Sequence, residues 1–355
     1  MMIYHTKSER SNKALEQTNG ALLETEAPFA AQRRCWADQT RMGVCASFGK
    51  CCLRRWHAEA KEDSMKTTLG LAVALVALSP PARAGSQGAV SGTATSPDRI
   101  PIRYHAAGKG DPALVFVHCG GCERGFWDGQ VAHFAAKHRV VALDLAGHGQ
   151  SGGGRKDWTM PAFGQDVVSV VEALGLKRVV LIGHSIGGPV VLEAARRMPG
   201  RVAGLVLVDT LVNFEQRPPA AEEIEKFLSE LQAHYRATLT AYVSQHLFSA
   251  STPEPVKARV LEAVLSAPQE IGVAAARSSV AYDPLPALRE IKAPIRAINT
   301  DLFPTNVEGN RRQVPGYQVA IMKGVGHYPM LEQPEAFNAL LAEALRELAR
   351  SGGRR

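Results

Sequence analysis

The sequence predicts an α/β fold, a doubly wound and mostly parallel sheet with an inserted helical cap. Three observations support this prediction. Short apolar runs alternate with helical patterns, one long interval carries no strand pattern, and a Gly-x-Ser-x-Gly turn joins a strand to a helix. Strands that are apolar on both faces are typical of a parallel sheet covered by helices, and their alternation with helices is typical of doubly wound folds.

Seven segments carry the strand pattern. The first, 99–105, alternates in polarity and contains Pro101, which an edge strand tolerates. The others are continuous apolar runs of the length of a buried strand. They cover 113–118, 139–145, 178–184, 204–209, 295–299 and 317–322. Helices are expected between and after them, at 161–174, 189–198 and 334–349.

The interval from Leu211 to about Lys292 interrupts this alternation. Prolines divide it into four helical patterns, at 220–228, 234–247, 254–266 and 268–281. Helical insertions of this kind cover active sites and shape substrate pockets. We therefore expect an α/β core formed by 85–210 and 293–355, with 211–292 as the cap.

The segment 65–84 has the pattern of a secretory signal peptide. A short charged start at Met65 precedes an apolar stretch and the small-residue site Ala82-Arg83-Ala84. The apolar stretch is shorter than the roughly 20 residues that a membrane span needs. These features predict an exported protein, periplasmic or secreted, that begins at Met65 and is not stably inserted in a membrane.

Residues 1–64 are accordingly interpreted as a mis-assigned or unusual upstream extension. They show no sustained periodicity and hold four of the six cysteines. Those cysteines, Cys35, Cys45, Cys51 and Cys52, have a spacing that fits no familiar zinc-ligand pattern.

The charge balance excludes a nucleic-acid-binding protein. The whole chain carries a net charge of +7. However, 12 of its 41 basic and 8 of its 34 acidic residues lie in 1–84, so the remainder carries 29 against 26, a net charge of +3. It has no basic stripe interleaved with aromatic residues. We expect a small molecule as the partner.

The turn Gly183-His184-Ser185-Ile186-Gly187 carries the strongest chemical signal. It follows an apolar strand and opens a helix, which is the arrangement of a nucleophile elbow. So tight a turn forces Ser185 into a strained conformation that lifts its hydroxyl above the sheet edge. The amide of Ile186 points toward the same place, where an oxyanion could form.

A serine nucleophile needs a base and an acid. His327, on a glycine-rich loop after the last strand, is the candidate base. Two carboxylates at sheet edges could support it. Asp301, after the penultimate strand, is preferred, and Asp209, at the end of the strand before the cap, is the alternative.

The loop after strand 113–118 is expected to supply a second oxyanion donor, the amide of Gly120. Cys119 and Cys122 flank the glycines. They could form a local disulfide that braces the loop, or could equally be two free thiols, and a structural role is preferred to a redox-active pair. Trp127 is expected near the mouth of the pocket, as a substrate-binding residue, with core packing as the alternative.

Residues 99–350 resemble the α/β-hydrolase superfamily in its capped branch. The resemblance depends on the elbow sequence, on Gly326-His327, and on Asp144-Leu145-Ala146-Gly147-His148-Gly149. It implies Ser185 as the nucleophile, His327 as the base, Gly120 and Ile186 as oxyanion donors, and no metal or organic cofactor. In the family this loop usually begins with His-Gly, whereas here Cys119 follows His118. Phe303 stands where the family's acid usually lies, which keeps Asp209 as an alternative.

These expectations describe an exported serine hydrolase that cleaves an ester, thioester or lactone of a small to medium substrate. An aminopeptidase, a C–C bond hydrolase or a haloperoxidase-like enzyme would use a similar triad. An aminopeptidase would also need acidic side chains in the cap. Glu222, Glu223 and Glu225 are the candidates, but on an amphipathic helix they are better interpreted as a solvated face. A ligand-binding receptor on the same scaffold is the alternative from another class.

Overall fold

The computed structural model describes residues 89–352. The interpretations of 1–64 and of the signal peptide at 65–84 lie outside the described residues. Within 89–352, no helix combines the length and the hydrophobicity required to cross a membrane.

One eight-stranded sheet forms the centre of the described part, in the order β1-β2-β4-β3-β5-β6-β7-β8. All pairs from β4 through β8 are parallel, whereas β1 and β2, and β2 and β4, pair antiparallel. The strands are β1 (Val90–Thr95), β2 (Pro101–Ala107), β3 (Ala113–Val117), β4 (Val140–Leu143), β5 (Val179–His184), β6 (Val202–Val208), β7 (Ile295–Thr300) and β8 (Gln318–Met322). The predicted doubly wound, mostly parallel fold is confirmed.

The edge of the sheet differs from the prediction. Strand β1 pairs with β2 from Val90 opposite Ala106 to Thr95 opposite Pro101, so β2 is an inner strand. The small polar residues of β1 hid its strand pattern. Pro101 is tolerated because it is the first residue of β2, a position that proline can occupy in a strand.

Helices cover both faces of the sheet, and further helices form the cap. They are η1 (Arg124–Trp127), α1 (Asp128–Phe134), α2 (Met160–Ala173), α3 (Gly187–Arg197), α4 (Ala221–Ala233), α5 (Tyr235–His246), α6 (Glu254–Ser266), α7 (Gln269–Val280), α8 (Leu285–Glu290), α9 (Val307–Gln313), α10 (Pro329–Glu332) and α11 (Pro334–Gly352). Helices α2, α3 and α8 pack into one core layer, and α1 and α11 into the other.

Strand β3 shows how the apolar runs produce the two layers. Val115 and Val117 pack into the core under α2 and α3, whereas Leu114 and Phe116 pack into the core under α1 and α11. Successive side chains of a strand point to opposite faces, so a continuous apolar run is buried on both.

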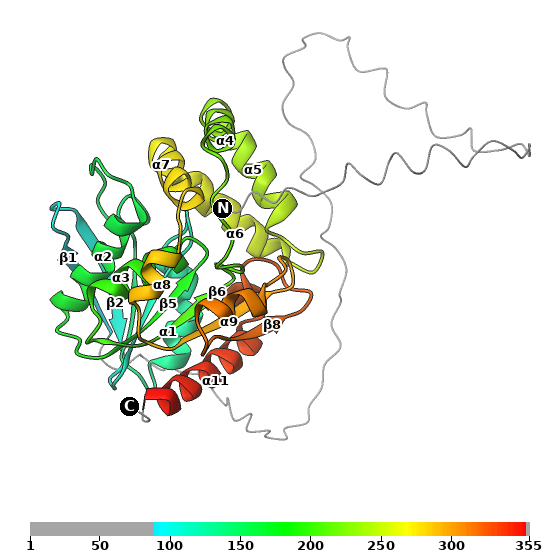
Figure 1. Cartoon of the computed structure of the whole chain (residues 1–355). Coiled ribbons are helices and arrows are strands. Elements are labelled where there is room, and N and C mark those ends of the chain that lie inside the picture. Colours follow the sequence, from blue (N-terminus) through cyan, green and yellow to red (C-terminus); the bar gives the residue numbers. More distant parts are fainter. Residues whose placement is uncertain (1–88, 353–355) are drawn as a thin grey trace, which may run out of the picture. The chain divides into compact units, whose positions relative to one another are not determined.

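The cap consists of α4 to α7 and lies in the chain between β6 and β7. Figure 1 shows these helices gathered at one end of the sheet. Helices α4, α5 and α7 share a small core of their own, which includes Ile224, Leu228 and Leu231 of α4 and Val280 of α7, whereas α6 packs into the core layer of α1 and α11. Helix α8 follows and packs on α3 in the main core.

Candidate active site

Ser185 stands at a sharp turn between β5 and α3. Its φ is +55°, a left-handed conformation that non-glycine residues rarely adopt. Backbone hydrogen bonds hold the turn, because Ser185 N donates to Val208 O (3.1 Å) and Gly188 N donates to Ser185 O (2.9 Å). Thr210 Oγ1 also donates to Ser185 O, at 2.6 Å. The strained elbow expected at Ser185 is present.

The backbone packs so closely around the two elbow glycines that neither position has room for a side chain. A Cβ on Gly183 would lie 2.2 Å from the carbonyl oxygen of Gly187. One on Gly187 would lie 2.7 Å from the carbonyl oxygen of Val117. The close approach of β5, α3 and β3 at this turn therefore requires both glycines.

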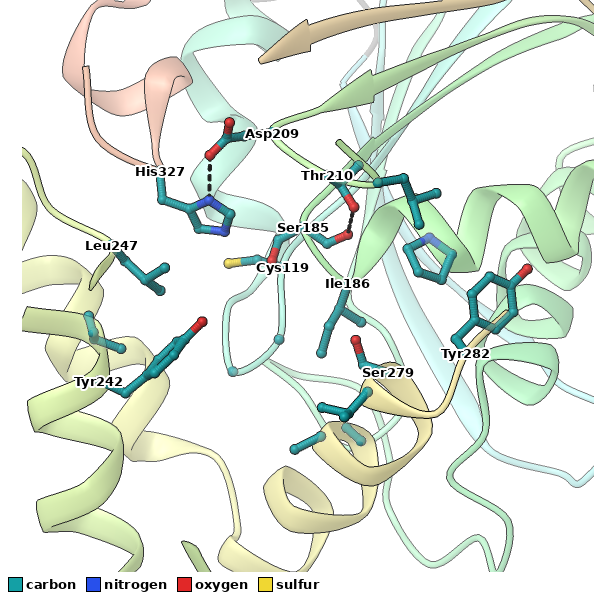
Figure 2. Close-up of a pocket in the computed structure, with 18 of the residues that line it drawn as sticks. Cys119, Ser185, Ile186, Asp209, Thr210, Tyr242, Leu247, Ser279, Tyr282 and His327 are labelled. Atoms are coloured by element: carbon teal, nitrogen blue, oxygen red, sulfur yellow. Dashed lines mark hydrogen bonds and ion pairs between the residues drawn. The ribbon is translucent and has the colours of Figure 1, made fainter. Parts of the chain in front are cut away.

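His327 and Asp209 are in direct contact. The Nδ1 atom of His327 lies 2.6 Å from Oδ2 of Asp209, and both side chains are buried (Figure 2). The other carboxylate oxygen, Oδ1, accepts hydrogen bonds from Thr300 N (2.7 Å) and Thr300 Oγ1 (2.9 Å). A carboxylate can only accept, so Nδ1 of His327 carries the proton and Nε2 is left as the basic atom.

The preference for Asp301 is wrong in the structure, and the alternative, Asp209, contacts the histidine. Asp301 is exposed, and its Oδ1 accepts a hydrogen bond from Gly324 N (2.8 Å) in the loop after β8. Asp209 follows β6 with φ +43°. That turn directs its carboxylate across the end of β7 to His327.

The backbone of His327 is fixed on both sides. Its N–H donates to Leu247 O of the cap at 2.8 Å, and its carbonyl accepts from His184 Nε2 at 2.7 Å. Burial, with the neighbouring imidazole of His327 adding to the effect, lowers the pKa of His184 well below its usual value. A neutral His184 therefore supports the loop that carries His327.

The two predicted oxyanion donors lie close to each other. Gly120 and Ile186 line the same cavity as Ser185, and a Cβ on Gly120 would lie 2.6 Å from Cδ1 of Ile186. Within the described part of the chain, neither backbone amide donates a hydrogen bond to another residue. Both N–H groups are therefore available to a ligand in this cavity.

The loop that carries Gly120 is braced from within the protein. Cys119 and Cys122 form a disulfide, one of the two structural alternatives that the sequence left open. His118 donates from Nδ1 to Cys119 O (2.7 Å) and accepts at Nε2 from Leu145 N (3.0 Å). Complete burial lowers the pKa of His118 to about 4, so its ring is neutral and serves as both donor and acceptor.

Trp127 does not lie at the pocket mouth, which corrects its assignment as a substrate-binding residue. Its side chain is fully buried and packs against Phe116, His184 and Phe337. Residues 124–134 form η1 and α1, which turn this large side chain toward the sheet and away from the cavity. Trp127 instead packs in the core, which was the alternative prediction.

A cavity of about 190 Å³ joins the core and the cap above Ser185. Its walls are mostly apolar, and the cap contributes Tyr235, Leu239, Tyr242, Leu247, Ser279 and Tyr282. Figure 2 shows Tyr242 and Leu247 on the side of His327, with Ser279 and Tyr282 on the opposite side of Ser185. Sequence reasoning missed these residues, because an amphipathic cap helix does not reveal whether its apolar face covers a core or a pocket.

Asp209 is the single acidic residue in the lining of this cavity. Glu222, Glu223 and Glu225, the candidates for an aminopeptidase, are absent from that lining, and Glu225 pairs with Arg277 on the cap surface. Among residues 89–352, no group of three or more His, Cys, Asp or Glu side chains is placed to hold a metal ion.

Comparisons with known proteins agree with the fold described above. An esterase from Thermogutta terrifontis aligns with a TM-score of 0.64 and 28% identity, covering 73% of this chain and 99% of that one. An enol-lactonase from Burkholderia xenovorans shares the fold, with a TM-score of 0.63, 22% identity, and 72% and 100% coverage. An uncharacterized protein of Mycobacterium bovis is 36% identical over 105 residues, 30% of each chain, so this chain spans under a third of that relative.

A family model described as the alpha/beta hydrolase family matches residues 114–340, a segment that runs from β3 into α11 and includes the elbow, the cap and the His327 loop. The chain belongs to the α/β hydrolase family.

Proposed function

We propose that the protein is an exported serine hydrolase that cleaves an ester, thioester or lactone of a small to medium molecule. The observation that carries this proposal is the contact between His327 Nδ1 and Asp209 Oδ2, which leaves the basic Nε2 of His327 in the cavity of Ser185. A strained serine, a correctly protonated imidazole and a buried carboxylate have the roles of a catalytic triad.

In this mechanism, Nε2 of His327 removes the proton from the hydroxyl of Ser185 as the oxygen attacks the substrate carbonyl. The imidazolium that forms lies against the Asp209 carboxylate, which stabilises its charge. Nε2 then gives the proton to the leaving alcohol or thiol. Water, activated by the same imidazole, releases the acyl group and regenerates Ser185.

The amides of Gly120 and Ile186 stabilise the oxyanion of each tetrahedral intermediate. Their N–H groups have no partner within the described protein and share the cavity with Ser185. Donors that are fixed before the reaction and shielded from water stabilise such charge strongly. Because the donors are backbone groups, the sequence can specify them only through the shape of the loop.

The cavity supports a compact and largely apolar substrate. Its volume of about 190 Å³ is below the range of about 300–1,000 Å³ that is usual for drug-sized ligands. The cap residues lie on two sides of Ser185, so one side would hold the acyl group and the other the leaving group (Figure 2). We assign the leaving group to the side of Tyr242 and Leu247, because His327 lies there and must protonate it.

A fluorophosphonate probe tests the proposed chemistry. We expect one adduct per chain, mapped to Ser185 by mass spectrometry, and no adduct in Ser185→Ala. His327→Ala should lower the labelling rate strongly. Ser266→Ala, a substitution on the exposed cap surface, is the matched control and should label like the wild type. Absence of an adduct on Ser185 in the wild type would refute the assignment and favour a ligand-binding protein.

Export has a separate test. The signal-peptide pattern at 65–84 supports it, and sequencing the N-terminus of protein recovered from the periplasm or the medium should give a start near Gly85. A start within the first residues of the printed sequence would refute both the export and the reassignment of Met65.

A further inference from the structure

The Cys119–Cys122 disulfide connects two cavities. Cys119 lines the cavity of Ser185 and His327, and Figure 2 shows its sulfur beside those residues. Cys122 lines a second cavity, of about 470 Å³, which is bordered by 147–150 and by residues of α6. Both cysteines are almost completely buried from bulk solvent. The disulfide therefore forms part of the wall of the active site and also meets a cavity outside it.

The chain between the two cysteines consists of Gly120 and Gly121. Gly121 has φ +70°, and a Cβ at this position would lie 2.9 Å from Cα of Val264 in α6. Two successive glycines have more accessible conformations than any other pair of residues. The direction of the Gly120 amide therefore requires a restraint from outside these two residues.

Two hydrogen bonds of the loop supply part of that restraint. Cys119 O accepts from Cys122 N (3.2 Å) and from His118 Nδ1 (2.7 Å). Because a peptide group is planar, these bonds also limit the direction of the Gly120 N–H, which belongs to the same peptide as Cys119 O. The bond from Cys122 N spans the turn that the disulfide closes. No described residue accepts a hydrogen bond from the Gly120 amide. The disulfide is the covalent link that closes this four-residue loop and limits how far the amide can turn.

We propose that the Cys119–Cys122 disulfide is a positioning element of the oxyanion hole, and that its reduction by a dithiol lowers the turnover of the enzyme. This inference rests on the proposed serine hydrolase function. With the bond intact, Gly120 lies beside Ile186 in the wall of the cavity of Ser185, where its amide is the proposed oxyanion donor. With the bond broken, Cys122 can leave the turn and its hydrogen bond to Cys119 O is lost, so His118 alone restrains the peptide that carries the Gly120 N–H.

One molecule of dithiol supplies the electrons and protons that the reduction of the disulfide needs. A thiolate of the dithiol attacks Sγ of Cys122 from the 470 Å³ cavity, and the S–S bond breaks with Cys119 leaving as a thiolate that takes up a proton. The second thiol of the reagent then attacks its own mixed-disulfide sulfur and releases Cys122. Two electrons and two protons pass to the protein, and the dithiol becomes a cyclic disulfide.

The expected effect falls on kcat. Loss of one oxyanion donor lowers kcat by roughly 10²–10³-fold, and a donor that is misdirected for part of the time lowers it by less. We expect a decrease of at least about tenfold, with KM changed by less than about twofold, because a donor used only in the transition state does not bind the ground state.

The test compares the full-length protein before and after reduction with dithiothreitol, with the reagent removed under nitrogen before assay on a short-chain p-nitrophenyl ester. Alkylation and peptide mapping establish that Cys119 and Cys122 are reduced, and the melting temperature establishes that the protein is folded. We expect a fall in kcat that reoxidation reverses. Cys119→Ser/Cys122→Ser should have a low kcat that dithiothreitol does not change.

Three results would overturn the inference. The first is an unchanged kcat with both thiols mapped. The second is a melting temperature below the assay temperature after reduction, which would make the bond a stabiliser of the fold only. The third is that the untreated protein, with its disulfide intact, neither hydrolyses the ester nor forms a fluorophosphonate adduct. In that case the proposed function fails, and the inference fails with it. If the double variant does not fold, reversible reduction of the wild type still decides between these results.

Discussion

Replacing Asp209 by Asn should disable the proposed catalysis, whereas replacing Asp301 by Asn should not. In Asp209→Asn, Oδ1 of the amide can still accept from Thr300. The amide nitrogen then faces Nδ1 of His327 as a donor. The imidazole would accept at Nδ1 and carry its proton on Nε2, so it could not take the proton of Ser185.

The magnitude follows from the lost charge. An imidazolium and a carboxylate whose charges lie about 4 Å apart interact by about 4 kcal/mol at an effective dielectric constant of 20. Each 1.36 kcal/mol of barrier is a factor of ten in rate. Removing the carboxylate charge should therefore lower kcat by about 10³-fold, and the wrong tautomer adds to this loss.

The assay is steady-state hydrolysis of a short-chain p-nitrophenyl ester, with the melting temperature as the control for folding. Asp301→Asn is the matched variant, because an amide oxygen can still accept from Gly324 N at this exposed position. Its kcat should remain within about threefold of the wild type. A large loss in Asp301→Asn, together with near-normal turnover in a folded Asp209→Asn, would refute the assignment of the acid.

Three further predictions concern the fold around the site. Because burial lowers the folded-state pKa of His118 to about 4, the unfolded chain binds a proton that the folded protein excludes between pH 6.5 and 4. The free energy of unfolding should therefore fall by about 2 kcal/mol from this residue between pH 7.5 and pH 5, measured by urea titration, and His118→Asn should reduce that slope. Gly183→Ala should give no soluble, labelled protein, since its Cβ would lie 2.2 Å from Gly187 O; normal fluorophosphonate labelling would contradict this. Trp127→Ala should lower the free energy of unfolding by about 3–5 kcal/mol and leave KM within about twofold, whereas a selective rise in KM would restore Trp127 to the pocket.

Most of the fold could be read from local patterns along the chain. The runs that became β3 to β7 were recognisable because burial on both faces requires continuous apolar residues. The run of β8 was also apolar enough to be recognised, although this edge strand is partly exposed. Ser185 and His327 were recognisable because a tight elbow and a glycine-rich loop are encoded by neighbouring residues. Strand β1 was missed, since its small polar residues contribute little to the core and its main partner is the backbone of β2.

The choice of acid depended on contacts between distant parts of the chain. Asp209 and Asp301 each follow a strand, and their local sequences do not distinguish them. Only the left-handed turn at Asp209, next to Thr300 at the end of β7, brings one carboxylate to His327 and leaves the other on the surface. The same holds for Trp127, because its apolar neighbours in sequence fit a core or a pocket equally well. Motifs that consist of adjacent residues are specified by local sterics, whereas pairings across the ends of a sheet are set by how the strands and helices pack.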